Sequence, residues 1–264
     1  MTVPKIVLIT GGNTGIGYET VKALLESDQA YRIFVGSRSS EKGNLAIEGL
    51  TKEHPKTTSS LELLEVDVST DESIQQAFEH VKAKTDHIDI LINNAGAAFD
   101  PLYLDGGISL RDCFNNAYNV NVTGAHIMTY TFMPLLLKST SPRLIFVTGL
   151  SHMTIASQKY FPTPPQPAGW PKEFDFDPIG YRCSKTALNM LILDWSHKLK
   201  ADGVKVFGAG PGFLATGLGG KPGLAEKMGA KHPSIGGQFL RTVVEGERDE
   251  DVGRLVEKGG ITPF

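Results

Sequence analysis

Short apolar runs separated by amphipathic stretches set the pattern of the chain. Six runs rich in apolar residues predict short strands at 5–9, 33–37, 61–66, 88–92, 143–148 and 204–209, with a seventh, edge strand between 253 and 260. Between the runs, apolar residues recur at helical spacing, most clearly at Ile74, Ala77, Phe78 and Val81. Helices are expected over about 109–137, from 181 onward and from 233 onward. A chain of 264 residues with this alternation fits one large α/β domain or two small ones.

The first run leads directly into a glycine-rich turn at 10–17, with the sequence TGGNTGIG. Gly11 allows a sharp turn, Gly15 lets a pyrophosphate approach backbone N–H groups at a helix start, and Gly17 lets helix and strand pack closely. An ordinary turn between a strand and a helix can also carry glycines. The position between strand and helix favours a dinucleotide-binding loop, with contacts expected from Gly11, Asn13, Thr14, Gly15, Ile16 and Gly17.

Composition narrows the class of protein. The chain carries 26 basic and 29 acidic residues, a net charge of −3, which gives no electrostatic case for nucleic acid or a membrane surface as partner. No apolar run approaches the ~18 residues of a membrane span, and the first strand begins too early to leave room for a signal peptide. Two cysteines favour the reducing cytoplasm, and the seven histidines lack paired metal-ligand spacing, so no metal is expected.

The second strand ends in a basic residue, Arg38. In a dinucleotide fold this position faces the adenosine ribose, where a carboxylate would bind a free 2′-hydroxyl and an arginine a 2′-phosphate. Arg38, with Lys42 and Asn13 as helpers, therefore favours NADP over NAD. The alternative is an arginine that is merely solvated at the surface.

Two further motifs carry candidate chemistry. Asn93-Asn94-Ala95-Gly96 follows the fourth run, where Asn and Gly suit a backbone that bends beneath a ligand. Tyr181 and Lys185 stand four residues apart, on one face of a helix. A neighbouring ammonium stabilises a phenolate and so lowers a tyrosine pKa of ~10 toward the range needed for proton exchange. Each motif alone also fits a plain turn or a chance spacing.

Together and in this order, TGGNTGIG, NNAG and Tyr-x3-Lys resemble the short-chain dehydrogenase/reductase family. TGGNTGIG, NNAGAAF and the Gly169-Trp170-Pro171 stretch look more narrowly like carbonyl reductases that use NADPH. The resemblance covers essentially the whole chain. It implies a single-domain doubly wound Rossmann fold over 1–264, with a central parallel sheet of about seven strands flanked by helices.

The resemblance also implies roles for individual residues. Tyr181 would donate the proton, Lys185 would hold the ribose hydroxyls, and Asn121 would kink its helix and order a relay water. Further cofactor contacts would come from Asp67 and Val68 at the adenine, and from Asn94, Ala95, Gly96, Pro211, Gly212, Leu214 and Thr216.

One position departs from the family pattern. Members usually end the fifth strand with a pair such as Ser-Ser, of which the second is catalytic, and that position is Gly149 here. Ser151, two residues on, is the favoured replacement, because alternate residues of an extended chain lie on one side. Thr148 is the next candidate.

The expected function is reduction of a ketone or aldehyde by hydride transfer from NADPH. One alternative is the same site running as an alcohol dehydrogenase. The other is a non-catalytic NADP(H)-sensing protein, which Gly149 favours and the Tyr181, Lys185 and Asn121 set disfavours.

The substrate and assembly depend on loops. The proline-rich excursion at 152–180 is either a cover for the substrate pocket or a rigid surface segment, and 213–235 could form a lid. The family commonly pairs through two long helices, which favours a homodimer or homotetramer, unless the excursion covers that surface and leaves a monomer. Apolar side chains on these loops suggest an apolar or aromatic substrate: Phe99, Leu102, Tyr103, Phe161, Trp170, Phe213 and Leu218.

Overall fold

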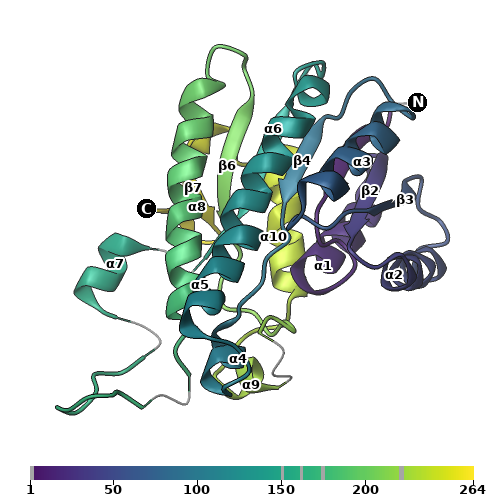
Figure 1. The fold of residues 1–264 in the computed structure, drawn as a ribbon. Coiled ribbons are helices and arrows are strands. Elements are labelled where there is room, and N and C mark those ends of the chain that lie inside the picture. Colours follow the sequence, from purple (N-terminus) through teal and green to yellow (C-terminus); the bar gives the residue numbers. More distant parts are fainter. Residues whose placement is uncertain (1–2, 150–151, 161–162, 174–175, 220–222) are drawn as a thin grey trace.

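The computed structural model describes residues 3–149, 152–160, 163–173, 176–219 and 223–264 as one α/β unit around a single sheet (Figure 1). The sheet has eight strands in the order β3-β2-β1-β4-β5-β6-β7-β8. The strands are β1 Lys5–Ile9, β2 Tyr31–Ser37, β3 Ser60–Glu65, β4 Ile90–Asn93, β5 Arg143–Val147, β6 Lys205–Gly210, β7 Leu255–Glu257 and β8 Gly260–Thr262. The helices are α1 Gly15–Leu25, α2 Ser40–Glu53, α3 Asp71–Lys82, α4 Asp100–Leu104, α5 Leu110–Tyr118, η1 Asn119–Gly124, α6 Ala125–Leu136, α7 Met153–Gln158, α8 Ile179–Lys198, α9 Leu224–Lys227, α10 Ser234–Glu245 and η2 Asp249–Asp251.

The sheet confirms the doubly wound prediction and adds one strand to it. β1 pairs in parallel with both β2 and β4, so the strand order reverses at β1. In such sheets a ligand binds beyond the carboxyl ends of the strands at this reversal. The seven strands β1 to β7 are parallel, whereas β8 is antiparallel to β7 and forms the edge. The expected seventh strand at 253–260 is therefore β7, but it is not the edge strand.

Alternation along the strands builds two separate cores. Val7 and Ile9 of β1 pack on one face with α1, α2 and α10, and Ile6 and Leu8 pack on the other with α3, α6 and α8. Because both faces of a parallel sheet are covered, its strands are apolar almost throughout, as β5 with its five buried residues shows. No helix in the described ranges is long and apolar enough to cross a lipid bilayer.

In the structure, the helical region expected at 109–137 is continuous and contains one wider, π-helical turn. α5 passes into the π-helix η1, which contains Asn121, and then into α6. Such widened turns are frequent at functional sites. A Cβ at Gly124, the last residue of η1, would overlap the Val68 carbonyl oxygen, so the widened turn lies directly against the backbone that follows β3.

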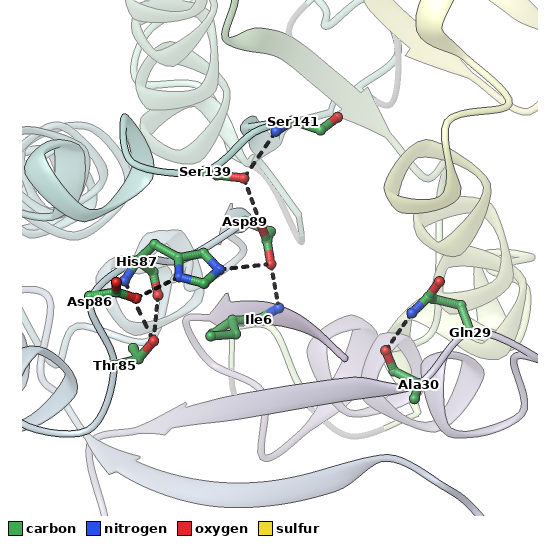
Figure 2. Close-up of polar contacts among 9 residues, drawn as sticks. All are labelled: Ile6, Gln29, Ala30, Thr85, Asp86, His87, Asp89, Ser139 and Ser141. Atoms are coloured by element: carbon green, nitrogen blue, oxygen red, sulfur yellow. Dashed lines mark hydrogen bonds and ion pairs between the residues drawn. The ribbon is translucent and has the colours of Figure 1, made fainter. Parts of the chain in front are cut away.

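Polar groups at the amino ends of the strands are paired with one another. Asp89 accepts hydrogen bonds from the Ile6 backbone N–H (2.8 Å) and from Ser139 Oγ (2.5 Å), and His87 lies between Asp86 and Asp89 (Figure 2). At the start of β5, buried Arg143 binds Asp249, which also pairs with Lys205 at the start of β6.

Candidate active site

The glycine-rich turn after β1 is held from β4 by the NNAG motif. Asn94 Nδ2 donates hydrogen bonds to the carbonyl oxygens of Thr10 (2.8 Å) and Gly11 (3.1 Å). The backbone N–H groups of Asn94 and Ala95 donate to Thr10 Oγ1 at 3.0 and 2.9 Å. The two motifs are therefore one structure at the reversal of strand order.

The glycines in this turn are required by its shape. Gly11 and Gly15 have φ of 63° and 56°, a region that side chains with a Cβ disfavour. A Cβ at Gly17 would overlap the Gly11 carbonyl oxygen. Gly15 begins α1, so unpaired N–H groups of the first helical turn face this loop, as the expected pyrophosphate site requires. Asn13 and Ile16 are partly buried and Thr14 is exposed.

The segment after β6 lies against the same loop. A Cβ on Gly15 would stand 3.5 Å from Thr216 Cγ2, and one on Gly236 would meet Pro211 and Leu214. Gly212 has φ of 89° and nothing within 4 Å of a Cβ position, so its surroundings are open. Thr216 therefore lies against the glycine-rich turn, whereas Pro211 and Leu214 pack on α10.

Arg38 and Asp67 stand near each other at the ends of β2 and β3. Arg38 is exposed just before α2. Burial raises the pKa of Asp67, but hydrogen bonds from Ser69 and the charge of Arg38 bring it below its ordinary value. Asp67 Oδ1 accepts from Ser69 N (2.9 Å) and Ser69 Oγ (2.6 Å), while Val68 beside it is buried.

Tyr181 and Lys185 lie in the first two turns of α8, with Lys185 Nζ 5.7 Å from the Tyr181 ring centre. Lys185 is 3% exposed and donates to the Val147 carbonyl oxygen at 2.9 Å. Burial lowers its pKa to about 8, and burial also raises the pKa of the Tyr181 phenol. A buried ammonium bonded to a carbonyl, with no carboxylate partner in the described residues, is costly for stability and typical of a functional site.

Asn121 joins the NNAG loop to α8. Its Oδ1 accepts from Ala97 N (2.8 Å), and its Nδ2 donates to Ala97 O and to Ser184 Oγ, both at 2.8 Å. A Cβ on Gly96 would come within 3.2 Å of Asn121 Oδ1 and 3.4 Å of Lys185 Nζ. The glycine at position 96 thus lets the NNAG loop lie closely against both of these groups.

The structure describes two of the three positions considered for the missing serine. Thr148 is 4% exposed, and its hydroxyl donates to Asn189 Oδ1 at 2.9 Å. Gly149 has φ of 153° and nothing within 4 Å of a Cβ position. Ser151, the favoured candidate, lies outside the described residues.

Two residues at this site are not indicated by any pattern in the sequence. Asp100, at the start of α4, binds the backbone N–H groups of Gly180 and Tyr181. Ser184 receives the hydrogen bond from Asn121 and donates to the Tyr181 carbonyl oxygen at 2.6 Å. Ser184 stands inside the Tyr-x3-Lys motif, but nothing local distinguishes it from its neighbours. The partners of Asp100 are 80 and 81 residues away.

The loops expected to form the pocket walls meet in part. A Cβ on Gly219 would stand 3.0 Å from Pro101 Cγ, so the chain after 216 contacts α4. Residues 163–173 of the excursion stand away from the body of the molecule (lower left in Figure 1). Tyr160 lies against α8, with its ring centre 4.5 Å from the guanidinium carbon of Arg182. Trp170 is 88% exposed, and Phe161 lies outside the described residues. Among the residues that the structure describes, no cluster of three or more His, Cys, Asp or Glu side chains could hold a metal ion.

Comparison with known proteins gives the family. Residues 5–159 match the family model for short chain dehydrogenase. The chain is 47% identical over 264 residues to the short-chain dehydrogenase/reductase tropE of Talaromyces stipitatus, with 98% of each chain covered. It is 45% identical over 277 residues to the short-chain dehydrogenase/reductase eupG of a Phoma species, covering 99% of this chain and 98% of the relative. The NADPH-bound carbonyl reductase from chicken fatty liver has the same fold, with a TM-score of 0.75, 21% identity and 100% of both chains covered. The chain therefore belongs to the short-chain dehydrogenase/reductase family of oxidoreductases.

Proposed function

We propose that the protein reduces a ketone or aldehyde to an alcohol with NADPH, and that Tyr181 donates the proton. The observation that carries this proposal is the grouping of three side chains next to the glycine-rich turn. Lys185 and Asn121 both lie against Gly96, and Lys185 Nζ is 5.7 Å from the Tyr181 ring centre. NADPH, when bound, would supply the hydride. The protein would supply position, charge and the proton.

The chain's own groups divide the proton transfer among them. Burial keeps the Tyr181 phenol protonated at neutral pH, so a proton is available at its oxygen for a developing alkoxide. The Lys185 ammonium stabilises the phenolate that remains, because a buried charge near the Tyr181 ring is weakly screened by water. Asn121 fixes the loop at Ala97 against α8. A relay water held by Asn121 would deliver a new proton to the Tyr181 oxygen after the reaction.

NADPH is the preferred cofactor in this proposal because of the groups after β2. Arg38 is exposed just before α2, and in this proposal its guanidinium binds the 2′-phosphate with Lys42 and Asn13 as helpers. None of the residues at 36–38 is acidic. Replacing Arg38 with Ala should raise the KM for NADPH about tenfold and leave the KM for NADH within twofold.

The remaining elements extend this proposal. In this proposal the excursion at 152–180 moves from the position seen in the structure to cover one side of the pocket when the carbonyl compound binds, and 213–235 closes over the nicotinamide as a lid. Phe99 and Phe213, both partly buried, favour an apolar or aromatic carbonyl compound. Two free thiols, Cys113 and Cys183, fit the cytoplasm.

A homodimer is the proposed assembly. Tyr130 of α6 is 71% exposed and Met190 of α8 is 67% exposed, which leaves apolar side chains on the two helices through which the family pairs. Light scattering should give twice the chain mass of 28.6 kDa, and Met190→Asp should shift it toward the monomer.

The test of the reaction is NADPH consumption with aryl ketones, ketoesters and aldehydes, with NADH in parallel, for wild type and Tyr181→Phe. We expect turnover with NADPH that falls at least a hundredfold in the variant. Turnover only with alcohols and NADP⁺ would favour the oxidative direction. Tight NADPH binding without turnover on any substrate would favour the sensor, which Gly149 in place of the usual serine would then explain.

A further inference from the structure

We propose that Asp100 is a positioning residue for the reaction: it fixes the backbone of Tyr181 and so sets where the proton donor stands. This inference rests on the proposed function of Tyr181. It concerns a residue that neither touches the carbonyl compound in the proposal nor belongs to the motifs described above.

Asp100 binds Tyr181 through the backbone rather than the side chain. Its Oδ1 accepts from Gly180 N at 2.6 Å, and its Oδ2 accepts from Tyr181 N at 3.0 Å. Both carboxylate oxygens are therefore used on two successive amides at the start of α8. These N–H groups lie in the first helical turn, where no residue within the helix can accept from them.

The site is built for this contact. Asp100 is 3% exposed, and no ion pair joins it to a basic side chain in the described parts of the chain. A Cβ on Gly180 would stand 3.0 Å from Asp100 Oδ1 and 3.1 Å from Cys113 Sγ, so a glycine permits the close approach. Burial raises the pKa of Asp100. The pKa values of neighbouring Asp177 and Cys113 are raised first by their own burial and further by the charge of Asp100. Burying the charged carboxylate costs free energy of solvation. Its hydrogen bonds from the two amides and the positive end of the α8 dipole offset this cost.

Asp100 also links the proton donor to the loop that follows β4. Asn121 binds both backbone groups of Ala97, three residues before Asp100. Ser184 connects Asn121 to the Tyr181 carbonyl oxygen. The Tyr181 peptide groups are thus held on both sides: the N–H by Asp100 and the C=O through Ser184 and Asn121.

The described part of the segment that leads into α8 offers its first turn no helix or strand as support. The described residues between α7 and α8 form neither helix nor strand. Without Asp100, the Tyr181 N–H would lose its tie to the loop that follows β4, and only the C=O side of the described contacts would still hold the first turn of α8 to that loop. A misplacement of about 1 Å between reacting groups can lower the rate by roughly a hundredfold.

The test compares Asp100→Asn and Asp100→Ala with wild type and with a matched control, Asp89→Asn. Asp89 also accepts from a backbone N–H and a second donor, but at the opposite edge of the sheet (Figure 2). The readouts are kcat per NADPH-binding site, KM for NADPH, and amide hydrogen exchange across 176–185 by mass spectrometry.

We expect kcat per binding site to fall about tenfold in Asp100→Asn and about a hundredfold in Asp100→Ala, with KM for NADPH within twofold. Asp89→Asn should leave kcat per binding site unchanged. Exchange across 176–185 should rise in both Asp100 variants and not in the control. Loss of stability alone would lower the number of binding sites but not the turnover of each.

Unchanged kcat per site in Asp100→Ala, or an equal fall in Asp89→Asn, would overturn the proposal. If wild type itself turns over no carbonyl compound, the proposed function fails. Faster exchange confined to 176–185 would then still support the positioning of Tyr181 by Asp100, and unchanged exchange would reject it.

Discussion

Buried charges are paired differently where the parallel strands begin, here called the amino edge of the sheet, and where they end, here called the carboxyl edge. At the amino edge, Arg143 meets Asp249, which also pairs with Lys205. At the carboxyl edge, Lys185 and Asp100 are buried against backbone groups without an opposite charge among the described residues.

The pKa values follow this contrast. The hydrogen bond from Arg143, with that from Lys205, lowers the pKa of Asp249 to about 2, which means that its charged form is favoured by folding. Burial lowers the pKa of Lys185 to about 8, which means that folding disfavours its charged form. The amino edge therefore contributes stability, and the carboxyl edge loses stability at groups that chemistry needs.

The largest expected effect comes from Lys185→Met. Turnover should fall roughly a hundredfold or more, because the phenolate loses its cation, while the melting temperature of the apoenzyme should stay or rise. The matched control is Lys205→Met at the amino edge, which should lower the melting temperature and leave turnover unchanged. Retention of more than a tenth of wild-type turnover in Lys185→Met would contradict the role of the Lys185 charge in the reaction.

Arg143→Met should do the reverse. Arg143 is buried, so its loss leaves Asp249 with only Lys205, and we expect a cost of about 3 kcal/mol in the free energy of unfolding. Urea unfolding measures this cost, and kcat at 25 °C should remain within twofold of wild type. A large fall in kcat would mean that the two edges are coupled.

The two edges should also respond oppositely to pH. Asp249 has a folded pKa of about 2 against an ordinary value of 3.8, so its stabilisation of about 2 kcal/mol is present above pH 4 and is lost as pH falls toward 2. Lys185 has a folded pKa of about 8 against 10.5, so its cost of about 3 kcal/mol is present below pH 8 and disappears as pH rises to 10.5.

Urea unfolding of wild type and Asp249→Asn between pH 5 and 2.5 should show a difference that shrinks with acid. The difference between Lys185→Met and wild type should shrink from pH 8 to 10.5. Differences that stay constant with pH would show that neither group has a shifted pKa.

The smallest effect is expected from Thr148→Val. The Thr148 hydroxyl donates to Asn189 inside the protein, so its removal should cost about 1 kcal/mol and change kcat less than threefold. Ser139→Ala, which removes a hydrogen bond to Asp89 at the other edge, is the matched control. A tenfold fall in kcat for Thr148→Val alone would give Thr148 the role of the missing serine.

The sequence predicted the elements whose causes are local. The apolar runs, the glycine turn and the four-residue spacing of Tyr181 and Lys185 are each fixed by neighbours in the chain. β8 could not be predicted because its three residues, of which two are partly buried and one is exposed, are too few to show a periodic pattern. Asp100 escaped because its role appears only when the chain brings 100 and 180 together, which no local pattern encodes.

The position of the excursion has a consequence for how this protein could acquire new substrates. The described residues between α7 and α8 stand outside the body of the fold, while α8 is tied to α4 through Asp100 (Figure 1). A change in the length or composition of 163–173 would therefore leave the contacts of Asp100 with the start of α8 in place. We expect such a change to alter which carbonyl compounds reach the site without altering the groups that react.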